Sequence, residues 1–340
     1  MFRRLLSTIF RVTAFVSILT LLPRMATAPA DSKSPADQTV IGMQLTYRVR
    51  YRSEGYTELG NALGGVSESR APTRHSLLAS LEAAEILNEM VTTALSAVGS
   101  PEAQDALCEA VRAKKDDVRA LSSLVPVLGS FGLPTQRVIA LLTNLSHSPS
   151  PDVRSMAVLA FGAAAKNLAP KSPHRADLIV KDLVGRLSSS KSTDDRLTLL
   201  LALSNTGSDT ARSIIVSQQA DPSPTVRRTV CTALSSFQHP DSVRALTKML
   251  KSDQDPNVRA SAVQALAAQN REPSVKEALL QAAQRDIADN VRVAAMFSLT
   301  DLVHSDGKVH DVIASLTQGD GSEVVRKQAA ILLQGANAGK

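Results

Sequence analysis

Tryptophan is absent from this sequence of 340 residues, and aromatic residues of all kinds make up only 3% of it. The three tyrosines, Tyr47, Tyr51 and Tyr56, all lie in the first fifth of the chain, and the rest holds only scattered phenylalanines. Proteins that bind single-stranded nucleic acid stack bases on rows of aromatic rings. The sequence therefore predicts no nucleic-acid partner.

Cysteine is also scarce, with Cys108 and Cys231 as its two occurrences and no pair at the CxxC spacing. Cys231 occupies an apolar position of a repeated helix, which favours a structural thiol over a redox or metal role. None of the six histidines is followed by glutamate, and the glycines near residue 60 lack the lysine of a phosphate-binding loop. These absences predict a non-enzymatic protein with no metal and no cofactor.

One sequence motif, which we call the phrase, is repeated along the chain, as in DPNVRASAVQAL (residues 255–266). Indexed on its arginine, the phrase recurs with gaps of 42, 31, 32, 33 and 34 residues. A period of this length is typical of a solenoid of stacked repeats. The arginines of the phrase are Arg154, Arg196, Arg227, Arg259, Arg292 and Arg326.

Each phrase has the pattern of an amphipathic helix. The positions one before and three, four and seven after the arginine are mostly apolar, which places them on one helix face. A second amphipathic segment, such as residues 274–283, follows most phrases, so each repeat is predicted to be a helical hairpin. Three phrases begin with a capping residue before proline, at Ser150-Pro151, Ser223-Pro224 and Asp255-Pro256.

Alanine recurs six residues after the arginine in four copies, where it would let neighbouring helices approach closely. These residues are Ala160, Ala202, Ala233 and Ala265. The 42-residue gap contains a longer segment between the helices, APKSPHRAD, which is expected to bulge from the surface.

The repeated arginine lies in the first turn of its helix, where the helix dipole disfavours a cation. A carboxylate is therefore expected beside it, forming a structural ladder that fixes the register of the repeats. The residues placed to supply this carboxylate are Asp152, Asp194, Asp255 and Asp289.

The phrase resembles the second helix of HEAT repeats, which opens with this D/P-x-V-R pattern, over about residues 100–336. The resemblance implies an all-α fold, a right-handed α-solenoid of HEAT-like hairpins. We assign residues 75–336 to this solenoid, residues 337–340 to a frayed tail, and residues 31–74 to a linker with a short β-strand. The strand is predicted at residues 43–51 because MQLTYRVRY alternates apolar and polar side chains.

Residues 1–30 contain no acidic residue, carry four arginines around an apolar run, and end in the small residues Ala26-Thr27-Ala28. This pattern is typical of a cleaved signal peptide and predicts an exported protein, either periplasmic or secreted, with no membrane span after cleavage. A mitochondrial presequence or an uncleaved membrane anchor is the alternative. Without Arg3, Arg4, Arg11 and Arg24, the net charge falls from +6 to about +2.

The early region also resembles the helical domain of large lipid transfer proteins of the vitellogenin type, over about residues 43–181. Two functions follow as hypotheses. The first is a scaffold that binds a protein or peptide partner on its repeat surface. The second is a lipid-binding or lipid-transport module, which implies exposed apolar surface near residues 43–100. An enzyme of the bilin-lyase type is a third reading, suggested only by the repeats.

Overall fold

The computed structural model describes residues 99–269 and 273–334, and the chain divides into two compact units, residues 1–113 and 114–340. In the first unit the described element is helix α6 (Pro101–Ala113). The predicted signal peptide, the linker and the β-strand at residues 43–51 lie outside the described residues, and so does the tail at residues 337–340. Within the described part of the chain there are fourteen α-helices and no β-strand.

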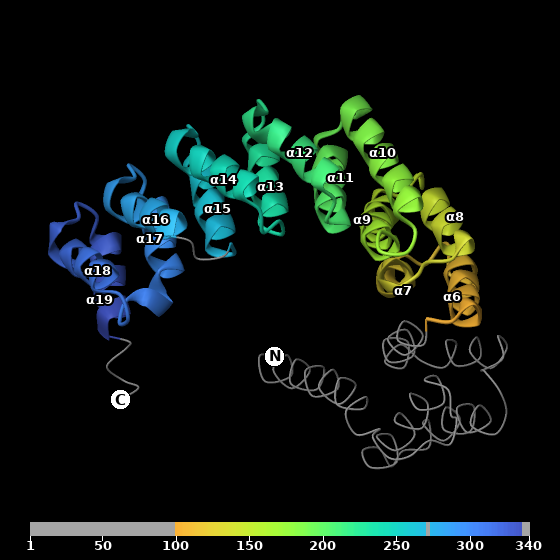
Figure 1. Ribbon diagram of the computed structural model, residues 1–340, viewed down its shortest axis with the longest axis horizontal. Helices are drawn as coiled ribbons and strands as arrows, with labels where there is room; N and C mark the ends of the chain where they lie inside the picture. The colour runs from red at the N-terminus through yellow and green to blue at the C-terminus, as the bar shows by residue number, and fades with distance from the viewer. Residues whose placement is uncertain (1–98, 270–272, 335–340) are drawn as a thin grey trace, which may run out of the picture. The chain divides into compact units, whose positions relative to one another are not determined.

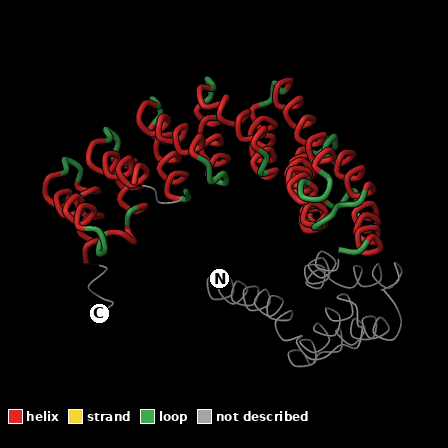
Figure 2. The backbone as a smooth tube through the Cα atoms, viewed as in Figure 1, coloured by secondary structure: helices red, strands yellow, loops and turns green. Residues whose placement is uncertain are grey.

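The second unit consists of α-helices joined by short loops, as Figure 2 shows. Two single turns of 3-10 helix, η2 (Gln218–Ala220) and η3 (Thr300–Leu302), follow α12 and α17. The helices are α7 (Val118–Ser130), α8 (Gln136–Leu145), α9 (Pro151–Leu168), α10 (Pro173–Ser189), α11 (Thr193–Thr206), α12 (Asp209–Ser217), α13 (Pro224–Leu234), α14 (Pro240–Ser252), α15 (Pro256–Ala267), α16 (Pro273–Arg285), α17 (Asp289–Ser298), α18 (Gly307–Gly319) and α19 (Glu323–Gln334).

These helices form a row of antiparallel pairs in two layers (Figure 1). The odd-numbered helices α7 to α19 each pack against the next odd-numbered helix, and we call them the arginine layer because α9 to α19 carry the repeated arginines. From α10 to α18 the even-numbered helices contact one another more sparsely and form the second layer. The predicted all-α solenoid of helical hairpins is thus the fold of the described residues.

The core lies between the layers and follows the predicted pattern. In α15 the four apolar positions around Arg259 are fully buried, and they are Val258, Ala262, Val263 and Leu266. The equivalent residues of α17, which are Val291, Ala295, Met296 and Leu299, are buried as well. A hairpin cannot cover such a stripe alone, so burial of the stripe depends on the neighbouring repeats.

The expected side-chain caps at Ser150 and Ser223 need correction. Helices α9, α13 and α15 begin at the predicted prolines, but only Asp255 uses its side chain as a cap, accepting the amides of Asn257 and Val258 at 2.7 and 3.3 Å. Ser150 and Ser223 make no such bond. At these helix starts the backbone amide of the serine donates to the side chain two positions earlier. The amide of Ser223, for example, donates to the Asp221 carboxylate at 2.9 Å.

The 42-residue gap also differs from expectation, because it is not a bulging loop. The extra residues lengthen the helices on either side of it, α9 to 18 residues and α10 to 17 residues. The segment APKSPHRAD is divided between the end of the turn and the first residues of α10, which Pro173 begins. Proline at the first helical position costs no hydrogen bond, so the helix can start there.

The alanines six residues after the arginine do lie at close helix contacts. Gly162 of α9 faces the backbone of Ala202 in α11, and a Cβ added at Gly162 would lie 2.1 Å from the Ala202 carbonyl oxygen. In the same way, Gly129 of α7 faces Ala160 of α9, with 2.4 Å between the added Cβ and the carbonyl oxygen. The arginine layer therefore requires a residue without a Cβ at Gly129 and Gly162.

Among the described residues, no helix combines the length and the apolar character needed to cross a membrane.

Gly162→Ala is expected to destabilise the protein by about 1–3 kcal/mol, because the new methyl group must push apart two backbones in the packed layer. The measurement is the free energy of unfolding in urea. Gly185→Ala is the matched control, since Gly185 lies in α10 with no atom within 4 Å of an added Cβ. It should stabilise the helix by about 0.5–1 kcal/mol. Equal effects of the two substitutions would contradict the close contact.

Candidate functional site

Consecutive repeats are joined by buried arginine–aspartate pairs. Arg227 of α13 donates from Nε and Nη2 to the two carboxylate oxygens of Asp253, at 2.7 and 2.8 Å. Its third nitrogen, Nη1, donates to the backbone carbonyl of Asp221 at 2.8 Å. Arg259 of α15 repeats this arrangement with Asp286, at 2.8 Å for both bonds, and with the carbonyl of Asp253 at 2.9 Å.

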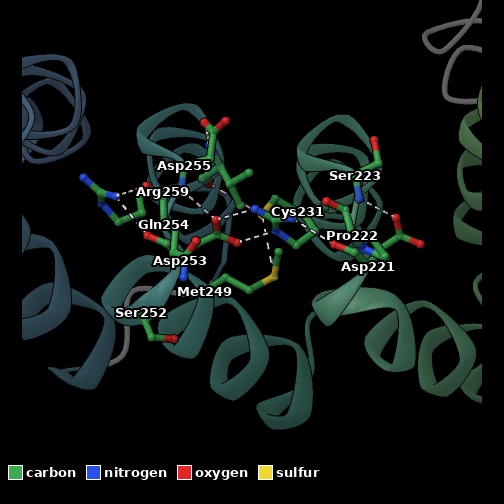
Figure 3. Close-up of polar contacts among 12 residues, drawn as sticks. Asp221, Pro222, Ser223, Cys231, Met249, Ser252, Asp253, Gln254, Asp255 and Arg259 are labelled. Atoms are coloured by element: carbon green, nitrogen blue, oxygen red, sulfur yellow. Dashed lines mark hydrogen bonds and ion pairs between the residues drawn. The ribbon is translucent and has the colours of Figure 1, made fainter.

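Each of these aspartates therefore connects two repeats. Figure 3 shows Asp253 in the turn before α15, close to Arg259 and Asp255. The Asp253 carboxylate accepts from Arg227 of the preceding repeat and from the amide of Asp255, at 3.0 Å for the amide. Its carbonyl accepts from Arg259 of its own repeat. Asp253 thus holds the turn before α15 and links this turn to α15 itself and to α13 of the preceding repeat.

We call each such pair a rung. The two neighbouring rungs also join consecutive repeats, although Arg196 binds its aspartate through Nη2 alone. Arg292 pairs with Asp320, with 2.8 Å from Nε to the carboxylate, and Arg196 pairs with Asp221. We call the set of arginine–aspartate pairs the ladder. Its four aspartates are nearly buried, with side chains 6–8% exposed, and they are Asp221, Asp253, Asp286 and Asp320.

Burial and pairing act in opposite directions on these carboxylates. Burial raises the pKa of Asp253, whereas the hydrogen bonds from Arg227 and the Asp255 amide lower it, and the net pKa is below the ordinary value of 3.8. A lowered folded-state pKa means that the ionised pair stabilises the fold above the usual aspartate pKa, and that this stabilisation is lost as pH falls through the lowered value. At neutral pH the rung is fully ionised.

Cys231 packs beside the ladder as a buried free thiol. Its sulfur lies 3.8 Å from the sulfur of Met249 and 3.9 Å from the carbonyl oxygen of Val258. Burial raises the pKa of this thiol to about 12, so it stays protonated at neutral pH. Cys108 is also buried.

The structure gives the ladder different carboxylates from those predicted. Asp289 does contact its arginine, with 2.8 Å from Nη2 of Arg292. Asp255 instead caps α15. Asp194 accepts a bond from Thr198 through its carbonyl, and Asp152 is an exposed residue in the first turn of α9; no ion pair joins either of them to an arginine in the described ranges.

A carboxylate within or between repeats was expected from these four residues, and Asp289 is the one of them that pairs with a repeated arginine in the described ranges. In the central rungs the guanidinium reaches out of the first turn of its helix to the loop of the next repeat, where a second helix start holds the aspartate. A signal for these residues was present, since aspartate stands six residues before the arginine in four repeats, as in Asp253 and Arg259.

The ladder changes at its two ends. Position 190, six residues before Arg196, is serine rather than aspartate, and Arg154 pairs with Asp195 through a single 3.3 Å contact. At the other end, Arg326 donates to the carbonyl of Asp320 at 2.7 Å, and no residue in the described ranges gives it a carboxylate. Both terminal rungs are weaker than the central ones.

A cavity of about 520 Å³ opens where the ladder changes at Arg154. Residues from α8, α9, α10 and α11 or the turns beside them line it, among them Arg154, Arg186, Ser190 and Asp195. Arg186 crosses from α10, where Nη2 pairs with Asp182 at 2.8 Å, and its Nη1 donates to the hydroxyl of Ser146 at 2.8 Å. The lining therefore combines two guanidinium groups with hydroxyls and apolar side chains.

The exposed face of the arginine layer changes character along the row. In α13 and α15 the residue five positions after the arginine is exposed and polar, Thr232 and Gln264. In α17 and α19 it is Phe297, which is 50% exposed, and Ile331, which is 55% exposed. Val324 of α19, on the same face, is 57% exposed. We call Phe297, Val324 and Ile331 the apolar patch.

The comparisons agree with the repeat pattern. A family model described as HEAT repeats matches residues 180–267. No curated protein matches the chain. The matched segment covers the end of α10 through α15, so this part of the row has the sequence signature of HEAT repeats.

Several solved structures are similar to the chain, three of them as follows. The complex of CpcE and CpcF of phycocyanin lyase from Nostoc sp. is 19% identical, with 46% of this chain and 99% of that chain covered and a TM-score of 0.38. Human deoxyhypusine hydroxylase is 18% identical, with 80% and 98% covered and a TM-score of 0.33. The archaeal HEAT-like repeats protein from Thermococcus onnurineus is 16% identical, with 69% and 97% covered and a TM-score of 0.36.

None of these findings supports the vitellogenin-type resemblance. Residues 99–269 and 273–334 contain no group of three or more His, Cys, Asp or Glu side chains placed to hold a metal ion.

Asp286→Ala is expected to lower the free energy of unfolding by about 3 kcal/mol, because it leaves the 7%-exposed Arg259 without its carboxylate. Asp152→Ala is the matched control and should cost about 1 kcal/mol or less, the size of a helix-dipole contribution. Urea unfolding of both variants gives the two values. A larger cost for Asp152→Ala would instead favour the carboxylate predicted from the sequence.

Proposed function

We propose that the protein is an exported, non-enzymatic HEAT-repeat scaffold that binds a protein or peptide partner. The observation that carries this proposal is the apolar patch on α17 and α19. Phe297 and Ile331 occupy equivalent positions on adjacent helices of the arginine layer, and each leaves at least half of its side-chain area exposed. Large apolar side chains gathered on one face are typical of a surface that another molecule covers.

The rest of the same face supports a protein partner. The layer presents exposed polar residues at Thr232 and Gln264 on the α15 side of the patch, and protein interfaces commonly combine apolar anchors with a polar rim. The ladder holds the helices in a fixed register, so the surface exists before the partner arrives and binding costs little ordering. Repeat scaffolds commonly use such extended surfaces for recognition.

Export is the second part of the proposal and is supported by the sequence of residues 1–30, which lie outside the described residues. The acid-free start, the apolar run and the Ala26-Thr27-Ala28 ending fit removal of this segment during secretion. A compartment outside the reducing cytosol is compatible with two thiols that are both buried.

The double variant Phe297→Ser, Ile331→Ser is expected to reduce recovery of the partner about tenfold or more, because aromatic and aliphatic anchors carry most of the binding energy of an interface. The measurement is native mass spectrometry and quantitative proteomics of the full chain isolated gently from the cells that make it. Leu178→Ser is the matched control, since Leu178 is 52% exposed but lies on α10 in the second layer.

Two outcomes of this experiment would contradict the proposal. One is a bound mass that organic solvent removes, which would make the protein a lipid binder. The other is equal loss of the partner in the control variant. The mass of the isolated chain also tests export, because removal of the segment ending at Ala28 is expected.

A further inference from the structure

The rung at Arg154 differs from the four rungs after it in one respect. In those rungs the carboxylate comes from the residue six positions before the next arginine, but at Arg154 that residue is Ser190. A serine cannot supply the two acceptor oxygens of a bidentate pair. The Asp195 carboxylate, which reaches Nε of Arg154 at 3.3 Å, has a side chain 41% exposed, against 6–8% for the aspartates of the later rungs.

The guanidinium of Arg154 is correspondingly incomplete. Its Nη1 donates to the carbonyl of Ser148 at 2.8 Å, as Nη1 of Arg227, Arg259 and Arg292 does to the carbonyl six residues before it, and its side chain is 30% exposed. Its Nη2, which binds a carboxylate oxygen in Arg227 and Arg259, has no acceptor in the described residues. Nη2 of Arg154 thus lacks the carboxylate that the same atom binds in Arg227 and Arg259.

The cavity of about 520 Å³ occupies this position. Arg186 brings a second guanidinium to its lining, but Asp182 pairs with that group at 2.8 Å, so the open Nη2 of Arg154 is the donor that an anion would meet. The hydroxyls of Ser146 and Ser190 donate to the carbonyls of Thr143 and Ser192, at 2.7 and 3.2 Å, and Val158 and Leu199 form apolar walls. The lining is therefore suited to an anionic group that is attached to a larger, partly apolar molecule.

We propose that this cavity binds the carboxylate of an aspartate or glutamate presented by the protein partner. The incoming carboxylate would bind the open Nη2 of Arg154, while Asp195 keeps its single 3.3 Å contact with Nε. The choice of a carboxylate rests on the chain itself, since the same guanidinium in the same register receives a carboxylate in each later rung. The inference rests on the proposed function, because the carboxylate belongs to the partner.

A direct test lets the chain itself supply the missing carboxylate. Ser190→Asp places a carboxylate six residues before Arg196, where the later repeats have theirs, and should close the rung against any ligand. Ser190→Asn is the matched control, with the same shape and no charge. The probe is the capped peptide acetyl-Asp-Pro-Ser-amide, which copies residues 221–223, and the readout is the Nε–H NMR signal of Arg154 in the full chain.

The peptide is expected to shift the Arg154 signal in the wild type and in Ser190→Asn, and to need at least tenfold higher concentration in Ser190→Asp. Arg154→Gln identifies the signal by its loss. It also gives a second variant, whose affinity for the peptide by calorimetry should fall at least tenfold. Both variants leave the apolar patch intact, so they test the cavity apart from the proposed interface.

Three results would overturn the inference. The peptide could leave the Arg154 signal of the wild type unmoved, or shift it equally in Ser190→Asp. Alternatively, inorganic phosphate could saturate the shift at a concentration tenfold lower than the peptide, which would make the cavity a phosphate site.

Discussion

The structure depends on one aspartate that serves two arginines. In the turn before α15, the carboxylate of Asp253 binds Arg227 of the preceding repeat, while its carbonyl binds Arg259 of its own repeat. The apolar stripes provide most of the burial energy, but apolar contact alone does not fix how far one hairpin is rotated on the next. A bidentate pair does fix this rotation, because the planar guanidinium binds a carboxylate in few orientations. The ladder therefore sets the register in which the arginine layer presents its surface.

The same constraint explains where a binding site can form. A complete rung engages every guanidinium nitrogen within the protein, as with Arg259, which binds Asp286 and two backbone carbonyls and whose side chain is 7% exposed. Replacement of one aspartate by Ser190 leaves the helices in place, because α9 and α11 still pack through Gly162, but it opens a cavity and an unmatched donor on Arg154. The same motif thus forms a closed pair in the central repeats and an open donor at Arg154.

The sequence predicted the periodic parts of this architecture and missed the parts that depend on contacts between repeats. The buried stripe around Arg259 and the helix start at Pro256 follow from local pattern, so they were predictable. The ladder aspartates were not, because helix-dipole reasoning considers only neighbours within one turn, whereas the partner of Arg227 is 26 residues away. The cavity depends on an absence, Ser190 in place of aspartate, which has meaning only once the rung geometry is known.

The most direct measurement is a pair of double-mutant cycles, one on Arg259 and Asp286 and one on Arg154 and Asp195, using Met for arginine and Asn for aspartate. A ladder that fixes the register through its buried rungs predicts a coupling free energy of about 2 kcal/mol for the first pair. For the second, exposed pair it predicts less than about 0.5 kcal/mol. Equal couplings, or a first coupling near zero, would contradict the account and leave apolar packing as the sole determinant of the register.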